Sequence, residues 1–204
     1  IKISQNLVQQ HKMLINHKKP LIYPIKKTIM RSYNISKGDA SIYISNMFFG
    51  GHLPKSIIVG FVETEAFHGS YKKNPFNFKH FNIRSSVIRV NGENFPADPI
   101  CPDFEKNLFL REYLEFYRNI GIDMNDDAGN LITPDLYRGG LFFLSFDLTG
   151  DQCNLHHNHK SISGAIDFSC VFKKELAVSV TMIVHATGEA QVEIGEKGPV
   201  VRNT

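Results

Sequence analysis

An apolar segment followed by a long aromatic loop constrains the fold of this chain most. Lys55–Val62 (KSIIVGFV) is rich in β-branched residues and is bounded by Pro54 and Glu63. A short run of this composition predicts a strand that is covered on both faces. Residues 72–81 (KKNPFNFKHF) then place three phenylalanines among Pro and Asn residues, which indicates a loop. A loop with so much apolar surface needs a partner, either from its own chain or from another.

The composition allows one sizeable core and argues against several classes of protein. The chain has 204 residues and is 42% hydrophobic, so it can bury a full core, and a β-rich sandwich of this length is typically one domain. The 23 Lys and Arg and the 20 Asp and Glu are spread along the chain, so no polybasic tract indicates direct binding to nucleic acid or a membrane. With no signal-peptide pattern and no run of about 18 apolar residues, we expect a soluble chain.

The cysteines and the two ends add weaker constraints. Cys101, Cys153 and Cys170 are an odd number without CxxC spacing, which favours a reducing compartment over a disulfide-stapled secreted domain. Residues 1–20 are polar and mildly basic and begin with Ile, so we expect an N-terminal linker or extension, and the chain could be one part of a longer polypeptide. The predicted domain spans residues 21–195, and residues 196–204 form a C-terminal tail.

Alternating and apolar segments predict strands along the whole domain. Pro24 makes the first of them an edge or bent strand, and the Asn91-Gly92 dipeptide predicts a tight turn after the fourth. The segment Lys37–Asp39 predicts a turn. The predicted strands are Leu21–Ile35, Ser41–Asn46, Lys55–Val62, Ile83–Val90, Leu141–Leu148, Ser163–Phe172, Ala177–His185 and a short last one at Ala190–Ile194.

A single helix interrupts these strands. Leu and Tyr residues at helical spacing, followed by Gly121 at the position of a C-terminal cap, predict a helix over residues 105–119. Pro96, Pro99 and Pro102 argue against regular structure just before it. The predicted fold class is therefore all-β: a jelly-roll β-sandwich of about eight strands with one inserted helix and long loops.

Four long segments carry a resemblance to a known family. LPKSIIVGFVETEAFHGSYKKNPFNFKHFNI, VNGENFP, PDFEKNLFLREYLEF and LFFLSFDLTGD resemble the capsid-like proteins of Polinton (Maverick) elements and adintoviruses, whose copies are scattered through animal genomes. The resemblance covers residues 21–193. It implies one of the two jelly rolls, the C-terminal one, of a double-jelly-roll major capsid protein.

The resemblance also implies what such a protein does. It would form trimeric, pseudo-hexameric capsomers that tile the shell of a double-stranded DNA virus or virus-like element. Its partners would be copies of itself and other capsid proteins such as penton, with no small-molecule substrate, no cofactor and no membrane. Its place would be the virion, assembled in the host nucleus or cytoplasm. This role is structural, so we expect no enzyme activity.

The aromatic residues of predicted loops are the candidate subunit interface. Interfaces between obligate partners resemble a domain core cut in half and are enriched in aromatic residues. The chain has 16 Phe and seven Tyr but no Trp, and a monomer would expose many of these rings. The candidate interface residues are Phe48, Phe49, Phe67, Tyr71, Phe76, Phe78, Phe81 and Phe95.

Metal and catalytic readings are weaker. His156 and His159 could reach one ion, but a structural zinc site needs four ligands, and a solvated polar loop is the preferred interpretation. Asp123, Asp126 and Asp127 lack the ordered spacing of a calcium-binding loop. No GxSxG, HExxH or phosphate-binding loop occurs, so we predict no catalytic residues, no metal and no cofactor.

Other functions stay open beside the shell-building one. Basic residues near aromatics, at residues 26–31 and 72–79, allow at most weak and non-specific nucleic-acid binding. The same fold would suit a minor single-jelly-roll capsid protein, or a lectin-like or host-domesticated binding module. A cupin-like enzyme is disfavoured because the His residues crowd one loop rather than adjacent strands.

Overall fold

The structure is a computed structural model that describes residues 4–16, 21–48, 53–122, 131–149, 163–195 and 198–203. The chain divides into two units, residues 28–187 and residues 1–27 together with 188–204. The described strands are β1 (Leu21–Ile35), β2 (Ser41–Ile44), β3 (Ser56–Glu63), β4 (Ile83–Val90), β5 (Glu93–Ile100), β6 (Phe143–Asp147), β7 (Ile166–Phe172), β8 (Val180–Gly195) and β9 (Gly198–Asn203). The described helices are α1 (Gln5–Asn16), α2 (Thr64–Phe67), α3 (Leu110–Asn119) and α4 (Pro134–Gly139).

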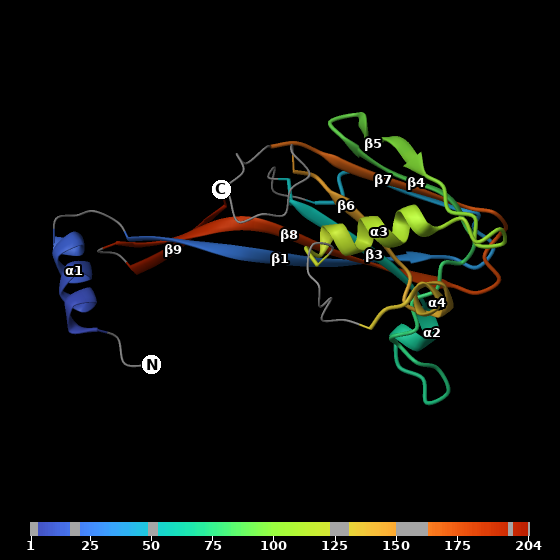
Figure 1. Cartoon of the computed structure of the whole chain (residues 1–204), viewed down its shortest axis with the longest axis horizontal. Coiled ribbons are helices and arrows are strands. Elements are labelled where there is room, and N and C mark those ends of the chain that lie inside the picture. The colour runs from blue at the N-terminus through green and yellow to red at the C-terminus, as the bar shows by residue number, and fades with distance from the viewer. Residues whose placement is uncertain are drawn as a thin grey trace. The chain divides into compact units, whose positions relative to one another are not determined.

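Eight strands form two sheets whose orders are β1-β8-β3-β6 and β2-β7-β4-β5, and β9 adds to β8. Strand pairs therefore nest within one another: β1 with β8, β2 with β7, β3 with β6 and β4 with β5. This nesting is what results when one long antiparallel hairpin rolls up into a sandwich, and it is the topology of a jelly roll. Figure 1 shows β4, β5 and β7 in one layer and β1, β3 and β8 in the other. The predicted all-β, jelly-roll fold class is confirmed.

The core lies between the two sheets of the larger unit. On β3, Ile57, Val59 and Phe61 are completely buried and alternate along the strand, so they point to one face. They pack in one cluster with residues of the opposite sheet such as Ile88 and Phe168. Gly60 and Val62 of β3 are buried too, on the other face. The prediction that this strand is covered on both faces is confirmed.

The prolines after the Asn91-Gly92 turn do not prevent a strand. Asn91 and Gly92 have φ of 53° and 91°, as the predicted turn requires. The next segment is β5, which contains Pro96 and Pro99 and pairs with β4 through an irregular register. The prediction that this segment lacks regular structure is wrong. β5 is an edge strand, and an edge strand tolerates proline because one side of it needs no hydrogen-bond donors.

The predicted helix begins five residues later than expected. α3 ends at Asn119, and Gly121 with φ of 74° donates its N–H to the Arg118 carbonyl at 3.0 Å, so the predicted end is confirmed. Its start is wrong because Asp103 forms a turn: Oδ1 of Asp103 accepts the N–H groups of Glu105 and Lys106 at 3.2 and 3.3 Å. The prediction of one helix after residue 20 is also wrong, since α2 follows β3 and α4 precedes β6.

The smaller unit contains α1, β9, the first part of β1 and the last part of β8. The N-terminal segment, predicted as a linker or extension, contains helix α1, and Tyr23 of β1 makes an edge-to-face ring contact with His11 of that helix. The predicted tail contains β9, which pairs with β8 from Ala190 to Gly195. The predicted separate strand at Ala190–Ile194 is wrong, because these residues continue β8 without a break. Among the described residues, the helices are too short or too polar to span a lipid bilayer.

Candidate functional site

Four connections meet at one end of the sandwich, which we call the loop end. Their described residues are 36–40 (β1–β2), 64–82 (β3–β4), 101–122 with 131–142 (β5–β6) and 173–179 (β7–β8). They emerge together because successive strands of a jelly roll run in opposite directions. Backbone hydrogen bonds join them: Gly38 N–H donates to the Leu176 carbonyl at 2.9 Å, and Thr64 N–H donates to the Ser179 carbonyl at 3.0 Å.

The β3–β4 and β5–β6 connections are joined most closely. Phe78 N–H donates to the Gly140 carbonyl at 2.7 Å, and Phe142 N–H donates to the Phe78 carbonyl at 3.0 Å, which gives a short parallel bridge. The ring of Phe78 lies 4.7 Å from that of Phe143, measured between centroids. The 64–82 segment, which we call the aromatic loop, is therefore fixed at its second half by backbone hydrogen bonds and ring packing.

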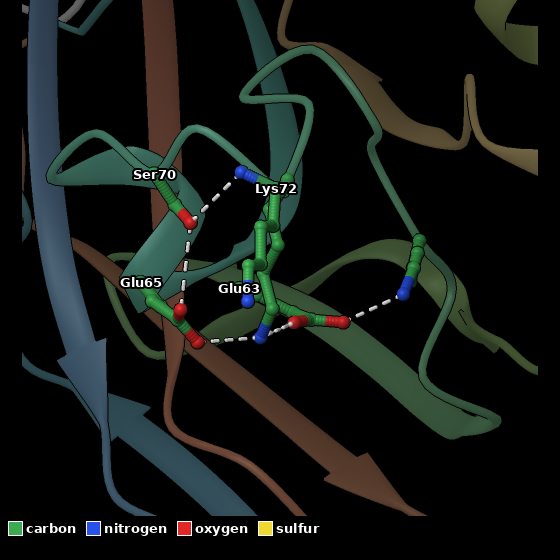
Figure 2. Close-up of polar contacts among 6 residues, drawn as sticks. Glu63, Glu65, Ser70 and Lys72 are labelled. Atoms are coloured by element: carbon green, nitrogen blue, oxygen red, sulfur yellow. Dashed lines mark hydrogen bonds and ion pairs between the residues drawn. The ribbon is translucent and has the colours of Figure 1, made fainter.

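Ion pairs also fix the aromatic loop to the end of β3. Glu63, at the end of β3, accepts hydrogen bonds from Lys73 Nζ at 2.7 Å and from Lys79 Nζ at 2.6 Å, and Lys73 Nζ also reaches Glu65 at 2.6 Å. Figure 2 shows these carboxylates and ammonium groups converging beneath the loop. The hydrogen bond from Lys73, then that from Lys79, holds the pKa of Glu63 below its usual value. The loop is thus tied at two points to the strand from which it leaves.

Short-range hydrogen bonds shape the tip of the loop. Asn74 Oδ1 accepts the Phe76 N–H at 2.9 Å, and Ser70 Oγ accepts the Lys72 N–H at 3.4 Å while donating to Glu65 at 3.5 Å. Side chains of this kind replace the backbone hydrogen bonds that a turn cannot make. With both halves anchored, the tip holds its aromatic side chains in a defined arrangement.

The structure separates the candidate interface residues into groups. Phe67, Tyr71 and Phe76 are exposed on the aromatic loop, with Phe67 at 43% and Phe76 at 72% of their possible surface. Phe78 and Phe81 are half-buried in the same loop, and Phe81 packs against the core. The three exposed rings project away from the chain, and the two half-buried rings support the loop.

The other three candidates lie elsewhere. Phe48 is only 6% exposed and belongs to the core cluster. Phe95 is half-buried on the edge strand β5 and lines a cavity beside α3. Phe49 lies outside the described residues.

Sequence reasoning missed a cluster of buried aromatic rings in the β5–β6 connection. Tyr137 of α4 is completely buried, donates its hydroxyl to the Phe143 carbonyl at 2.6 Å and contacts the rings of Phe109 and Phe142. Burial raises the pKa of its hydroxyl well above the usual value. The available signal for this aromatic cluster was the short spacing between Phe104 and Phe109, both of which are nearly buried. The prediction of a continuous helix over residues 105–119 obscured that signal. This cluster of buried rings supports the connections of the loop end.

Metal and redox candidates find no new support. Among the residues that the structure describes, no three His, Cys, Asp or Glu side chains group as metal ligands do. His156, His159, Asp123, Asp126 and Asp127 lie outside the described residues. Cys101 is exposed and Cys170 is buried, and both are free thiols.

Comparison with known proteins identifies a relative in sequence. No protein-family model matches the chain. It is 31% identical over 139 residues to the uncharacterized protein F54H12.2 of Caenorhabditis elegans. The match covers 67% of this chain and 32% of that protein, so the chain spans about a third of the relative's length.

Several solved capsid structures are similar to this chain. The Faustovirus major capsid protein superposes with a TM-score of 0.50 at 8% identity over 93% of this chain and 36% of its own. The PBCV-1 virus capsid gives 0.49 at 9% identity over 97% of this chain and 54% of its own, and the mavirus major capsid protein gives 0.44 at 12% over 91% and 42%. The Faustovirus likeness, at this identity, shows the fold alone: the chain has a capsid-like jelly roll.

Proposed function

We propose that this chain is a structural capsid protein whose aromatic loop makes contacts between subunits. It forms the C-terminal jelly roll of a double-jelly-roll major capsid protein in a double-stranded DNA virus or virus-like transposable element, related to Polinton (Maverick) elements and adintoviruses. Copies associate into trimeric, pseudo-hexameric capsomers that tile the virion shell together with other capsid proteins such as penton. Assembly takes place in the host nucleus or cytoplasm, and the role involves no catalysis.

The observation that carries this proposal is an anchored loop with an apolar tip. Two carboxylates and two lysines fix the loop beneath its tip, while Phe67, Tyr71 and Phe76 stay exposed. Exposed aromatic rings cost solvation free energy unless a partner covers them. Because the loop is held in place before binding, it loses less conformational entropy when a partner covers these rings. An anchored aromatic tip is therefore suited to permanent subunit contacts.

The fold and the sequence relative support the same proposal. The jelly roll is the fold that the chain shares with the Faustovirus major capsid protein. A relative in a nematode agrees with a family whose copies are scattered through animal genomes. In this proposal Phe78 and Phe81 support the aromatic loop, and Phe95 lies on the edge strand β5. Phe49 remains a predicted subunit contact. Phe48 packs in the core and leaves the proposed contact set.

The oligomeric state of the purified chain tests the proposal. Size-exclusion chromatography with light scattering, followed by electron microscopy, should show trimers or larger assemblies of the full-length protein. Replacing Phe67, Tyr71 and Phe76 together by Ser should shift the population toward monomers without changing the circular dichroism spectrum. Met30→Ser is the matched control, because Met30 is 64% exposed but lies on β1. It should leave the assembly unchanged.

Two results would argue against the proposal. A full-length protein that stays monomeric at high concentration would contradict self-association. Equal assembly by the triple variant would show that the aromatic tip is not the contact surface. A monomer that binds one glycan on an array would instead favour the lectin-like alternative.

A further inference from the structure

A cavity lies where α3 covers the open side of the sandwich. β5 and β6 are the edge strands of the two sheets, and α3 packs beside β6. Residues of β5, α3 and β6 together line a cavity of about 160 Å³. A cavity needs a volume of only about 10–15 Å³ on this scale to hold one water, so this cavity has room for several waters or one small ligand.

Two buried polar atoms in this cavity have no partner. Among the described residues, nothing hydrogen-bonds to Ser145 Oγ or to Asp147 Oδ2, although both atoms are shielded from solvent. Ser145 is only 7% exposed. The second oxygen of Asp147, Oδ1, is satisfied by the N–H and hydroxyl of Thr149 at 3.0 and 2.7 Å. A buried carboxylate oxygen without a donor is costly, so this site calls for a hydrogen-bond donor.

A third acceptor faces the same space. Glu112 of α3 is 6% exposed and lines the cavity, and burial raises the pKa of its carboxyl. The two arginines of the lining, Arg111 and Arg118, are exposed, and Arg118 forms an ion pair with Glu115 at 3.0 Å. Positive charge therefore lies toward solvent, whereas oxygen acceptors line the interior.

The remaining wall is apolar. Apart from the buried side chain of Asn119, the rest of the lining consists of the rings of Phe95 and Phe146 and the side chains of Pro96 and Ile100. Such a wall suits hydrocarbon rather than a hydrated ion. A divalent cation is also disfavoured, since no cluster of three acidic, His or Cys ligands exists among the described residues.

We infer that this cavity binds a primary ammonium group carried on a short hydrocarbon chain. An ammonium has three donors and no acceptor, which matches a lining of Asp147 Oδ2, Ser145 Oγ and the Glu112 carboxyl. Its methylene groups would lie along Phe95 and Phe146. A lysine side chain of another protein and a free aliphatic amine both carry this group.

Titration with n-butylammonium chloride tests the inference on the full-length chain. Amide chemical shifts of α3 and β6 should change with a dissociation constant on the order of 1 mM, as expected for a ligand of this size. n-Butanol, which has the same length without the charge, should bind at least about tenfold more weakly. Equal binding of the two, or no shift change at all, would overturn the inference and leave a cavity filled by water alone.

Two variants locate the binding. Asp147→Asn keeps an oxygen for Thr149 but removes the charge, and it should weaken n-butylammonium binding by about tenfold or more. Ser145→Ala should fold at least as well as the natural chain, because its hydroxyl has no partner to lose, and should weaken binding by about threefold or more. Thermal unfolding checks both folds. Unchanged affinity in a folded Asp147→Asn variant would overturn the assignment.

A second ligand distinguishes the two sources of the ammonium. The amide of Nα-acetyl-lysine carries the same chain on a peptide backbone. If it binds as well as n-butylammonium, the cavity admits a lysine of a partner protein. If only the free amine binds, the ligand is a small aliphatic amine.

Discussion

His80 stacks on Phe104 with ring centroids 3.8 Å apart and planes inclined by 17°. His80 lies in the β3–β4 connection and Phe104 in the β5–β6 connection, so this contact joins the two largest loops of the larger unit. Nδ1 of His80 accepts the Asn82 N–H at 3.0 Å, which requires that this nitrogen carry no proton. The folded chain thus favours the neutral imidazole, and burial, followed by the nearby charge of Arg138, lowers the pKa of His80 to about 4.

This arrangement predicts a pH dependence of stability. Above the unfolded pKa of about 6.5, His80 is neutral in both states and its contribution is complete. As the pH falls toward 4, the unfolded chain gains a proton that the folded chain excludes, so stability decreases. We expect a loss of about 1–2 kcal/mol from this residue, after allowing for solvent screening of a partly buried ring.

Urea denaturation at about pH 7.5 and about pH 5 measures this effect. His80→Phe keeps a ring on Phe104 but cannot titrate. The natural chain should therefore lose stability relative to the variant as the pH falls. A stability difference that is the same at both pH values would contradict the prediction.

Removing the charge of Glu63 should loosen the aromatic loop. Glu63→Gln deprives Lys73 and Lys79 of their shared partner, whose side chain is only 17% exposed. We expect a local free-energy loss of about 1 kcal/mol, which corresponds to about fivefold faster amide hydrogen exchange in residues 64–79.

An exposed ion pair provides the control for Glu63. Glu115 and Arg118 form an i,i+3 pair on α3 with both side chains at least 40% exposed. Such pairs contribute a few tenths of a kcal/mol, so Glu115→Gln should leave exchange in the aromatic loop unchanged. Equal exchange in the natural chain and the Glu63→Gln variant would show that these ion pairs do not anchor the loop.

A methyl group at Gly60 should displace the aromatic loop. A Cβ atom there would lie 2.8 Å from Phe78 Cδ1 and 3.1 Å from Phe143 Cε1. Overpacking of this kind costs about 1–3 kcal/mol, and we expect Gly60→Ala to lower the unfolding free energy by that amount.

Gly139→Ala serves as the matched substitution. Its Cβ would meet nothing within 4 Å, and its position in helix α4 favours alanine. Thermal unfolding should therefore show destabilisation for Gly60→Ala and none for Gly139→Ala. The reverse order would mean that the packing of Phe78 over β3 does not restrict this glycine.

The strands could be predicted because their patterns are local. Leu21–Ile35 and Ile83–Val90 have the same bounds in the sequence prediction and in the structure. Alternation, β-branched residues and turn dipeptides act within a few residues, so one segment suffices to identify them. The number of predicted strands and the single predicted helix indicated a jelly-roll sandwich, and the resemblance to a capsid family implied the same fold.

The errors arose where distant residues decide the local structure. Whether Pro96 disrupts a strand depends on its place at a sheet edge, which only the pairing of β5 with β4 reveals. The start of α3 depends on Asp103, whose side chain both caps a turn and pairs with Lys173 at 2.9 Å. Likewise, the sequence cannot distinguish exposed Phe76 from buried Phe48, because burial depends on what the rest of the chain places over each ring.

The nested strand pairing has a consequence for synthesis of the protein. β1 is synthesised before the other strands of this jelly roll, but its neighbour in the sheet is β8, which follows six further strands in the sequence. Until then the edge of β1 has no hydrogen-bonding partner, and the closure of such long-range contacts is slow. A cell that makes many copies at once would therefore contain many chains in which β1 is unpaired, and general chaperones would be needed to keep these nascent chains from associating with one another.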